Sequence, residues 1–85
     1  MSNASARVVA GPREFLTTNG AYCPLIEVHV EVSIVYDSNT YMARIRRYEE
    51  TPDGRKFIRL GDIDLDEMAE IHEIYYDLIK ELGLA

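Results

Sequence analysis

The feature that most constrains the fold is an alternating run of residues between Ile26 and Tyr36. Apolar or aromatic side chains occupy every second position, and Glu27, His29 and Glu31 stand between them. A period of two residues is typical of a β-strand that buries one face and exposes the other, as in an antiparallel sheet. The run therefore predicts one antiparallel strand with a single buried face.

Turn residues on the C-terminal side of this run predict further strands. The Asp-Ser-Asn segment at 37–39 favours a turn, after which residues 40–49 return as the second strand of a hairpin. In the Thr-Pro-Asp-Gly segment at 51–54, proline presets its φ and glycine accepts a positive φ, which favours a second turn. Residues 55–60 then form a short strand that Gly61 ends.

The C-terminal segment predicts a helix with defined ends. Asp64 is a good N-cap, Glu67 lies three residues later as a capping box requires, and Gly83 ends the helix. Apolar residues recur at spacings of three and four, and they span a wider face than one small sheet needs. We therefore expect this helix to pack also against the same helix of a second subunit. The expected dimer interface comprises Leu65, Met68, Ile71, His72, Tyr75, Leu78, Ile79 and Leu82.

The N-terminal residues complete the expected order of elements. Ala6–Ala10 is interpreted as a short strand that Gly11-Pro12 breaks, and residues 17–20 as a turn. Met1–Ser5 are small and polar, and we expect them to be disordered or foreign to the natural protein. Residues 6–85 are then a single α+β domain of ββββα order, a curved four-stranded antiparallel sheet followed by one helix.

Length, cysteine content and hydropathy limit the class of protein. A chain of 85 residues forms one domain with a modest core, which dimerisation would enlarge. The single cysteine, Cys23, excludes an internal disulfide and fits a reducing compartment. No segment approaches the roughly 20 apolar residues of a membrane span, and the N-terminus lacks the layout of a signal peptide. We therefore expect a cytoplasmic protein that does not bind membranes.

Charge is segregated along the chain. The net charge is −6, and from Asp62 to the C-terminus there are eight acidic residues and one base, Lys80. Most of the basic residues instead fall within a short basic segment, residues 44–59. They are Arg44, Arg46, Arg47, Arg55, Lys56 and Arg59. The whole-chain charge disfavours a polyanionic partner, whereas the local field of the basic segment favours one.

The basic segment admits two interpretations. Arginine forks pair with phosphates, and Tyr36, Tyr41 and Tyr48 could stack on bases, as single-stranded DNA or RNA requires. Alternatively, the segment does not bind nucleic acid: its arginines pair with carboxylates such as Glu31 and Glu49 or with a neighbour's acidic helix, or they recognise an acidic segment of a protein partner.

Residues capable of catalysis or metal binding do not form a recognisable constellation, so we expect neither an enzyme nor a cofactor. Cys23 has no evident base partner, and His29 and His72 lack a second ligand at metal spacing. His72 falls on the apolar stripe of the helix, where a packed core histidine is expected. The acidic run from Asp62 superficially resembles a calcium loop, but Glu67 stands where that loop requires glycine.

Residues 32–65 resemble the DNA-binding domain of the transcriptional coactivator family called positive cofactor four, including its bacterial relatives. Val32-Ser33 opens a strand as in that family. Ile45-Arg46-Arg47-Tyr48 is similar to its Ile-Arg-x-Tyr strand, and Pro52-Asp53-Gly54 to its Pro-acidic-Gly turn. Gly61–Leu65 is similar to the segment that leads into its final helix. The chain differs at Glu49, where the family has tryptophan, and in having no base at residues 36–40.

The resemblance implies a strongly curved four-stranded sheet and a homodimer formed through the C-terminal helices. It also implies binding of single-stranded or melted DNA with little sequence preference, in transcription or genome maintenance. Arg46 would contact DNA by its position in the motif, and Tyr48 would belong to the same strand motif.

Overall fold

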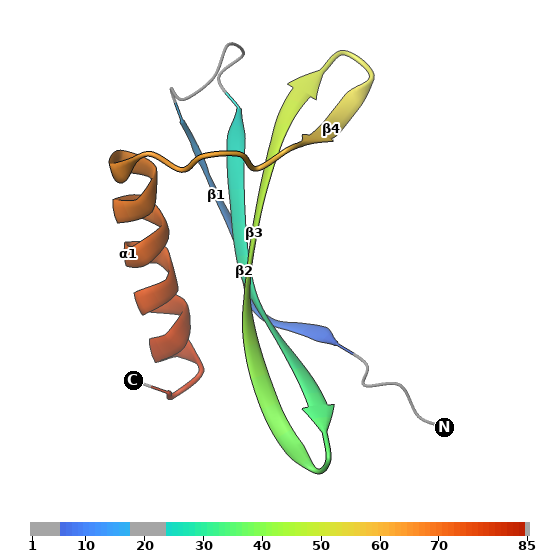
Figure 1. The fold of residues 1–85 in the computed structure, drawn as a ribbon, viewed down its shortest axis with the longest axis vertical. Helices are drawn as coiled ribbons and strands as arrows, with labels where there is room; N and C mark the ends of the chain where they lie inside the picture. Colours follow the sequence, from blue (N-terminus) through green and yellow to red (C-terminus); the bar gives the residue numbers. More distant parts are fainter. Residues whose placement is uncertain (1–5, 18–23, 85) are drawn as a thin grey trace.

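The computed structural model describes residues 6–17 and 24–84, which form one antiparallel sheet and one helix (Figure 1). Met1–Ser5 and Cys23 lie outside the described residues. The sheet has the order β1-β2-β3-β4, and the helix follows it, so the predicted ββββα order is confirmed. The elements are β1 (Arg7–Leu16), β2 (Leu25–Val35), β3 (Ser38–Thr51), β4 (Gly54–Ile58) and α1 (Leu65–Glu81).

The first strand is longer than the sequence predicts, because Gly11-Pro12 bends β1 without ending it. The register against β2 shifts between Ala10 and Arg13, which is how a strand absorbs an irregularity and changes direction. Gly11 has φ 85°, and a Cβ there would lie 3.1 Å from the Cβ of His29. Glycine is therefore required by both the backbone conformation and the close approach of the two strands. Figure 1 shows the first part of β1 turning away from the rest of the sheet.

The β2–β3 hairpin turns one residue earlier than the sequence predicts. Val35 pairs with Ser38, so Tyr36 and Asp37 form a two-residue loop. Both have positive φ, 52° and 62°, as a hairpin turn that follows the right-handed twist of the strands requires. The Tyr36 side chain is 96% exposed at this tip.

The alternating apolar residues of β2 form one buried face, as the sequence predicts. Ile26, Val28 and Val30 are buried on the side of the sheet that carries α1. Ile71 and Leu78 of α1 are buried against them in two clusters that share partly buried neighbours. The helix lies mainly over β1 and β2, as Figure 1 shows, so β3 and β4 receive little cover from it. The side of the sheet away from α1 is hereafter the open face.

Both ends of α1 form as the sequence predicts. The Asp64 side chain accepts a hydrogen bond from the Glu67 backbone N–H at 2.7 Å, and Glu67 Oε1 accepts one from the Asp64 N–H at 3.1 Å. The reciprocal pair is a capping box, which satisfies two backbone donors that no helical carbonyl can reach. Gly83, with φ 72°, ends the helix in a left-handed conformation.

Candidate interaction surfaces

The basic segment is divided between two sides of the sheet. In the register of β2 and β3, Arg44 and Arg46 lie opposite His29 and Glu27 on the open face. Arg47 lies opposite Ile26, on the side that carries α1. The predicted alternation of these arginines is therefore correct, and it means that they cannot all contact one ligand.

Arg47 is the most deeply buried of these bases, with 5% of its surface exposed. Its guanidinium donates to both carboxylate oxygens of Glu67, at 2.7 and 3.1 Å, and to the Leu60 carbonyl at 2.9 Å. Glu67 is 2% exposed and also accepts a hydrogen bond from the Thr17 hydroxyl at 2.5 Å. This network joins the end of β1, β3 and the first turn of α1. Arg47 therefore stabilises the fold, and its buried guanidinium is not available to bind a phosphate.

Arg44 and Arg55 lie on the open face but have carboxylate partners. Arg44 Nε lies 3.2 Å from Glu31, and Arg55 donates two hydrogen bonds of 3.1 Å to Glu14. Arg55 Nε also lies 3.3 Å from Glu50. The charges of these two arginines are therefore largely compensated within the chain.

The two carboxylates that face these arginines are stabilised in their ionised form. A hydrogen bond from the Tyr48 hydroxyl, followed by those from Arg55, lowers the pKa of Glu14 below its usual range. A hydrogen bond with His29, and then one from Arg44, lowers the pKa of Glu31. The open face therefore presents negative charge beside its arginines near neutral pH.

Tyr48 is fully buried, so it offers no ring surface on which a base could stack. The Arg55 guanidinium lies 4.4 Å from the ring centroid, and Phe57 meets the ring edge-on with centroids 5.7 Å apart. Its hydroxyl donates a hydrogen bond to Glu14. Burial, together with that bond, raises the pKa of Tyr48 to about 12. Of the other stacking candidates, Tyr36 and Tyr41 are 96% and 44% exposed.

Three bases of the segment keep an uncompensated charge. Arg46, Lys56 and Arg59 form no ion pair with any carboxylate of residues 6–17 and 24–84. The Arg46 guanidinium lies 5.4 Å from the centroid of Phe57, whose side chain is 57% exposed. An exposed cation on an exposed aromatic ring is thus the strongest polyanion-binding feature of the open face. Sequence reasoning did not include Phe57, although it lies in the basic segment between Lys56 and Arg59.

The expected dimer interface is divided between the core and the surface. Ile71 and Leu78 are buried within the chain. Leu82 and the Tyr75 ring pack against the same core, and the Tyr75 hydroxyl lies 3.0 Å from the His29 carbonyl oxygen. These residues stabilise the monomer. The others, Leu65, Met68, His72 and Ile79, are exposed.

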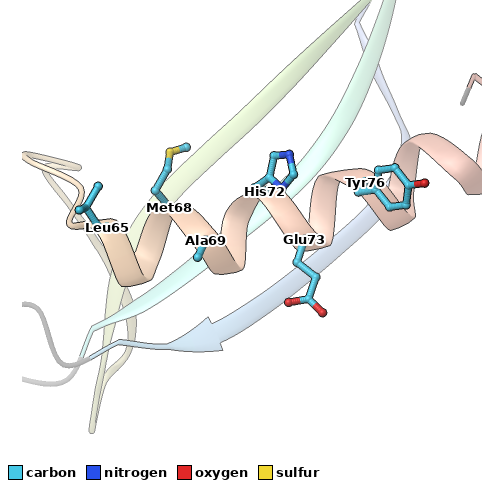
Figure 2. Close-up of a pocket in the computed structure, with 6 residues that line it drawn as sticks. All are labelled: Leu65, Met68, Ala69, His72, Glu73 and Tyr76. Carbon is cyan, nitrogen blue, oxygen red and sulfur yellow. The ribbon is translucent and has the colours of Figure 1, made fainter.

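Ile79 lies in a hollow beside β3, whereas Leu65, Met68 and His72 belong to a different, apolar surface along α1, shown in Figure 2. We call it the outer face of α1, and it consists of Leu65, Met68, Ala69, His72 and Tyr76, with Glu73 at its border.

The expectation that His72 is a packed core residue is wrong. It lies on the flank of the helix that turns away from the sheet, with Met68 one turn before it and Tyr76 one turn after it (Figure 2). Leu65 is 86% exposed, Met68 42% and Tyr76 55%. Sequence reasoning missed Tyr76, although its spacing of four residues from His72 would have identified it.

Neither a metal-binding cluster in the described residues nor a comparison with known proteins indicates a function. Within the ranges that the structure describes, no three His, Cys, Asp or Glu side chains are grouped so as to hold a metal ion. In the same ranges, no helix has the length and apolar character needed to cross a membrane. Comparison with protein-family models, curated proteins and solved structures finds no match for this chain. The surfaces themselves are therefore the basis for a functional proposal.

Arg47 and its exposed neighbour Arg46 should differ in how much each contributes to the stability of the fold. Replacing Arg47 with Ala leaves the Glu67 carboxylate buried without its cation, so the free energy of unfolding should fall by about 3–5 kcal/mol. Replacing Arg46 with Ala removes only an exposed cation–π contact, which contributes about 0.5–1 kcal/mol. Urea denaturation followed by circular dichroism, at one protein concentration, measures both. Equal losses would contradict a structural role for Arg47.

The second prediction concerns pH. The pKa of Glu14 is lower in the folded than in the unfolded chain, so its contribution to stability is complete above the unfolded value of about 4.3 and is lost as pH falls through the folded value. Glu14→Gln should therefore destabilise the protein at pH 7, by no more than about 1 kcal/mol because the site is partly exposed, and the effect should shrink progressively as pH falls below the unfolded value. The exposed turn variant Asp53→Asn is the control, and a Glu14→Gln effect independent of pH would contradict the assignment.

Proposed function

We propose that this chain is a non-enzymatic protein-interaction module that forms a homodimer through the outer face of α1. The observation that carries the proposal is the row of large apolar side chains left exposed there. Leu65, Met68 and Tyr76 are each at least 42% exposed and line one continuous hollow with Ala69 and His72. Contiguous apolar surface of this kind, as opposed to scattered single residues, typically marks an interaction site.

A second copy of the chain is the partner that this surface suits best. A two-fold interface brings the same surface of each subunit together, and a helix face with apolar residues three and four apart packs well against its own copy. The outer face is bordered by one acid, Glu73, and one base, Lys80, whose ammonium lies 5.4 Å from the centroid of the Tyr76 ring, so two chains of net charge −6 would meet where charges of both signs are present. The core of the single chain is small, and the added burial would stabilise it.

Binding of single-stranded nucleic acid is the second candidate, and one observation favours it. Arg46 lies over exposed Phe57, and Lys56 and Arg59 of the same basic segment have no carboxylate partner in the described chain, although Lys56 lies opposite Glu49 in the strand register, on the side of the sheet that carries α1. The resemblance to the positive cofactor four family points the same way. Against it, the carboxylates of Glu14 and Glu31 lie on the open face and would repel phosphates. We therefore place this function after the interaction module.

The third prediction tests the dimer. Light scattering after size-exclusion chromatography should give about twice the 9.7 kDa chain mass. Met68→Glu would place two desolvated carboxylates near the two-fold axis, so dimerisation should weaken by roughly a hundredfold or more. Met68 is exposed in the single chain, so the variant should remain folded by circular dichroism. Asn39→Asp adds the same charge on the hairpin and should stay dimeric. A wild-type monomer at all concentrations would refute the proposal.

The fourth prediction decides between the two functions. If the chain is solely a protein-interaction module, fluorescein-labelled oligo-dT should show no saturable change in anisotropy at micromolar protein and physiological salt. If it binds nucleic acid, affinity should fall steeply as salt rises, because phosphate contacts release counterions. Arg46→Ala should then weaken binding, and Arg13→Ala should not, since Arg13 pairs with Glu81 of α1 on the other side of the sheet.

A further inference from the structure

Among the described residues, most of one edge of the third strand is not paired with another strand. β3 contains 14 residues, but β4 pairs only with its last part, from Arg47 to Thr51. Figure 1 shows β4 beside only one end of β3. On that side, no strand of the described chain pairs with residues Ser38–Arg46, which we call the free edge of β3. Alternate residues of an antiparallel strand direct their backbone N–H and C=O groups to each side, so the free edge is a template for another strand.

The free edge has little of the usual protection against strand addition. Its sequence contains neither proline nor lysine, and its charged residues are the two arginines Arg44 and Arg46. It is not shortened either, since the free part of β3 is longer than the part that β4 covers. An edge of this kind is expected to pair with an extended chain.

Two apolar hollows lie along this edge. One is lined by Tyr41, Met42 and Ala43 of β3 together with Tyr75 and Ile79 of α1. The other is lined chiefly by Ile45, Arg46, Phe57, Ile58 and Leu60. The two hollows are about four residues of β3 apart, and residues four apart in an added strand point to the same side. The edge therefore suits a segment with two apolar side chains at that spacing.

The charges beside the edge favour acidic residues in the same segment. Arg44 and Arg46 project from this part of β3 to the open face, and an added strand would place alternate side chains next to them. Arg46 has no carboxylate partner in the described chain and supplies the uncompensated charge; Arg44 pairs with Glu31, but 48% of its side chain remains exposed. A second copy pairing edge to edge would instead bring two further arginines to the same face, which disfavours that occupant.

We propose that the free edge of β3 binds an extended acidic segment of a partner protein by strand addition. The backbone of the segment would pair with β3, apolar side chains four residues apart would enter the two hollows, and acidic side chains between them would meet Arg44 and Arg46. This site is separate from the outer face of α1, so it does not depend on dimerisation through Met68 and Tyr76.

The test uses a fluorescein-labelled nine-residue peptide of alternating valine and glutamate, followed by fluorescence anisotropy. We expect saturable binding, and at least about tenfold weaker binding of an analogue N-methylated at alternate amides, which cannot complete the backbone pairing. A composition-matched peptide without alternation should bind comparably weakly, and a peptide with lysine in place of glutamate should not bind. Amide exchange measured by NMR should slow in Ser38–Arg46 when the alternating peptide is added.

Variants of the protein complete the test. Arg46→Glu should weaken binding of the alternating peptide at least about tenfold, whereas Lys80→Glu, the same charge change on α1, should not. Met68→Glu should bind the peptide as the wild type does, which separates this site from the dimer surface. The proposal is overturned if no peptide binds at millimolar concentration, if the methylated or non-alternating peptides bind equally well, or if the protected amides lie in α1. Edge-to-edge pairing of β3 between two copies would overturn it as well.

Discussion

The buried pair of Arg47 and Glu67 is the interaction on which the arrangement of the domain depends. It fixes the start of α1 against β3, and the Thr17 hydroxyl binds the same carboxylate from the end of β1. Two charges taken out of water require close and nearly complete hydrogen bonding, and Glu67 receives it from the guanidinium, the hydroxyl and the helix N-cap backbone. Since the pair holds the first turn of α1 beside β3 and the end of β1, it helps to position the helix on the sheet.

Within the described residues, that position leaves two surfaces without cover. The helix lies over β1 and β2, so part of its own apolar circumference, around Met68 and Tyr76, turns to solvent, and so does much of β3. A chain with a net charge of −6 and a small core gains from covering such surfaces. Dimerisation through α1 and strand addition at β3 are two ways to do this, and they use different residues.

The polar residues of the open face explain why a concentration of bases in the sequence need not create a basic surface. Strand pairing brings Glu14 and Glu31 from β1 and β2 beside Arg55 and Arg44, and the resulting ion pairs compensate much of the positive charge. Arg46, Lys56 and Arg59 stay uncompensated within the described chain, and of these Arg46 lies on the open face. The mixed charges of the open face favour a ligand segment that offers apolar side chains in addition to negative charge.

Local patterns in the sequence determined the order of elements, the buried face of β2, the capping box at Asp64 and the alternation of Arg46 and Arg47. These features depend on periodicity and on residues close together in the chain, so they can be predicted without knowledge of the fold. Only the tertiary structure decided that β1 continues past Gly11 and that His72 is exposed. It also decided which bases have acidic partners, because those partners come from strands distant in sequence, and their proximity is a consequence of sheet register and of the place where the helix packs.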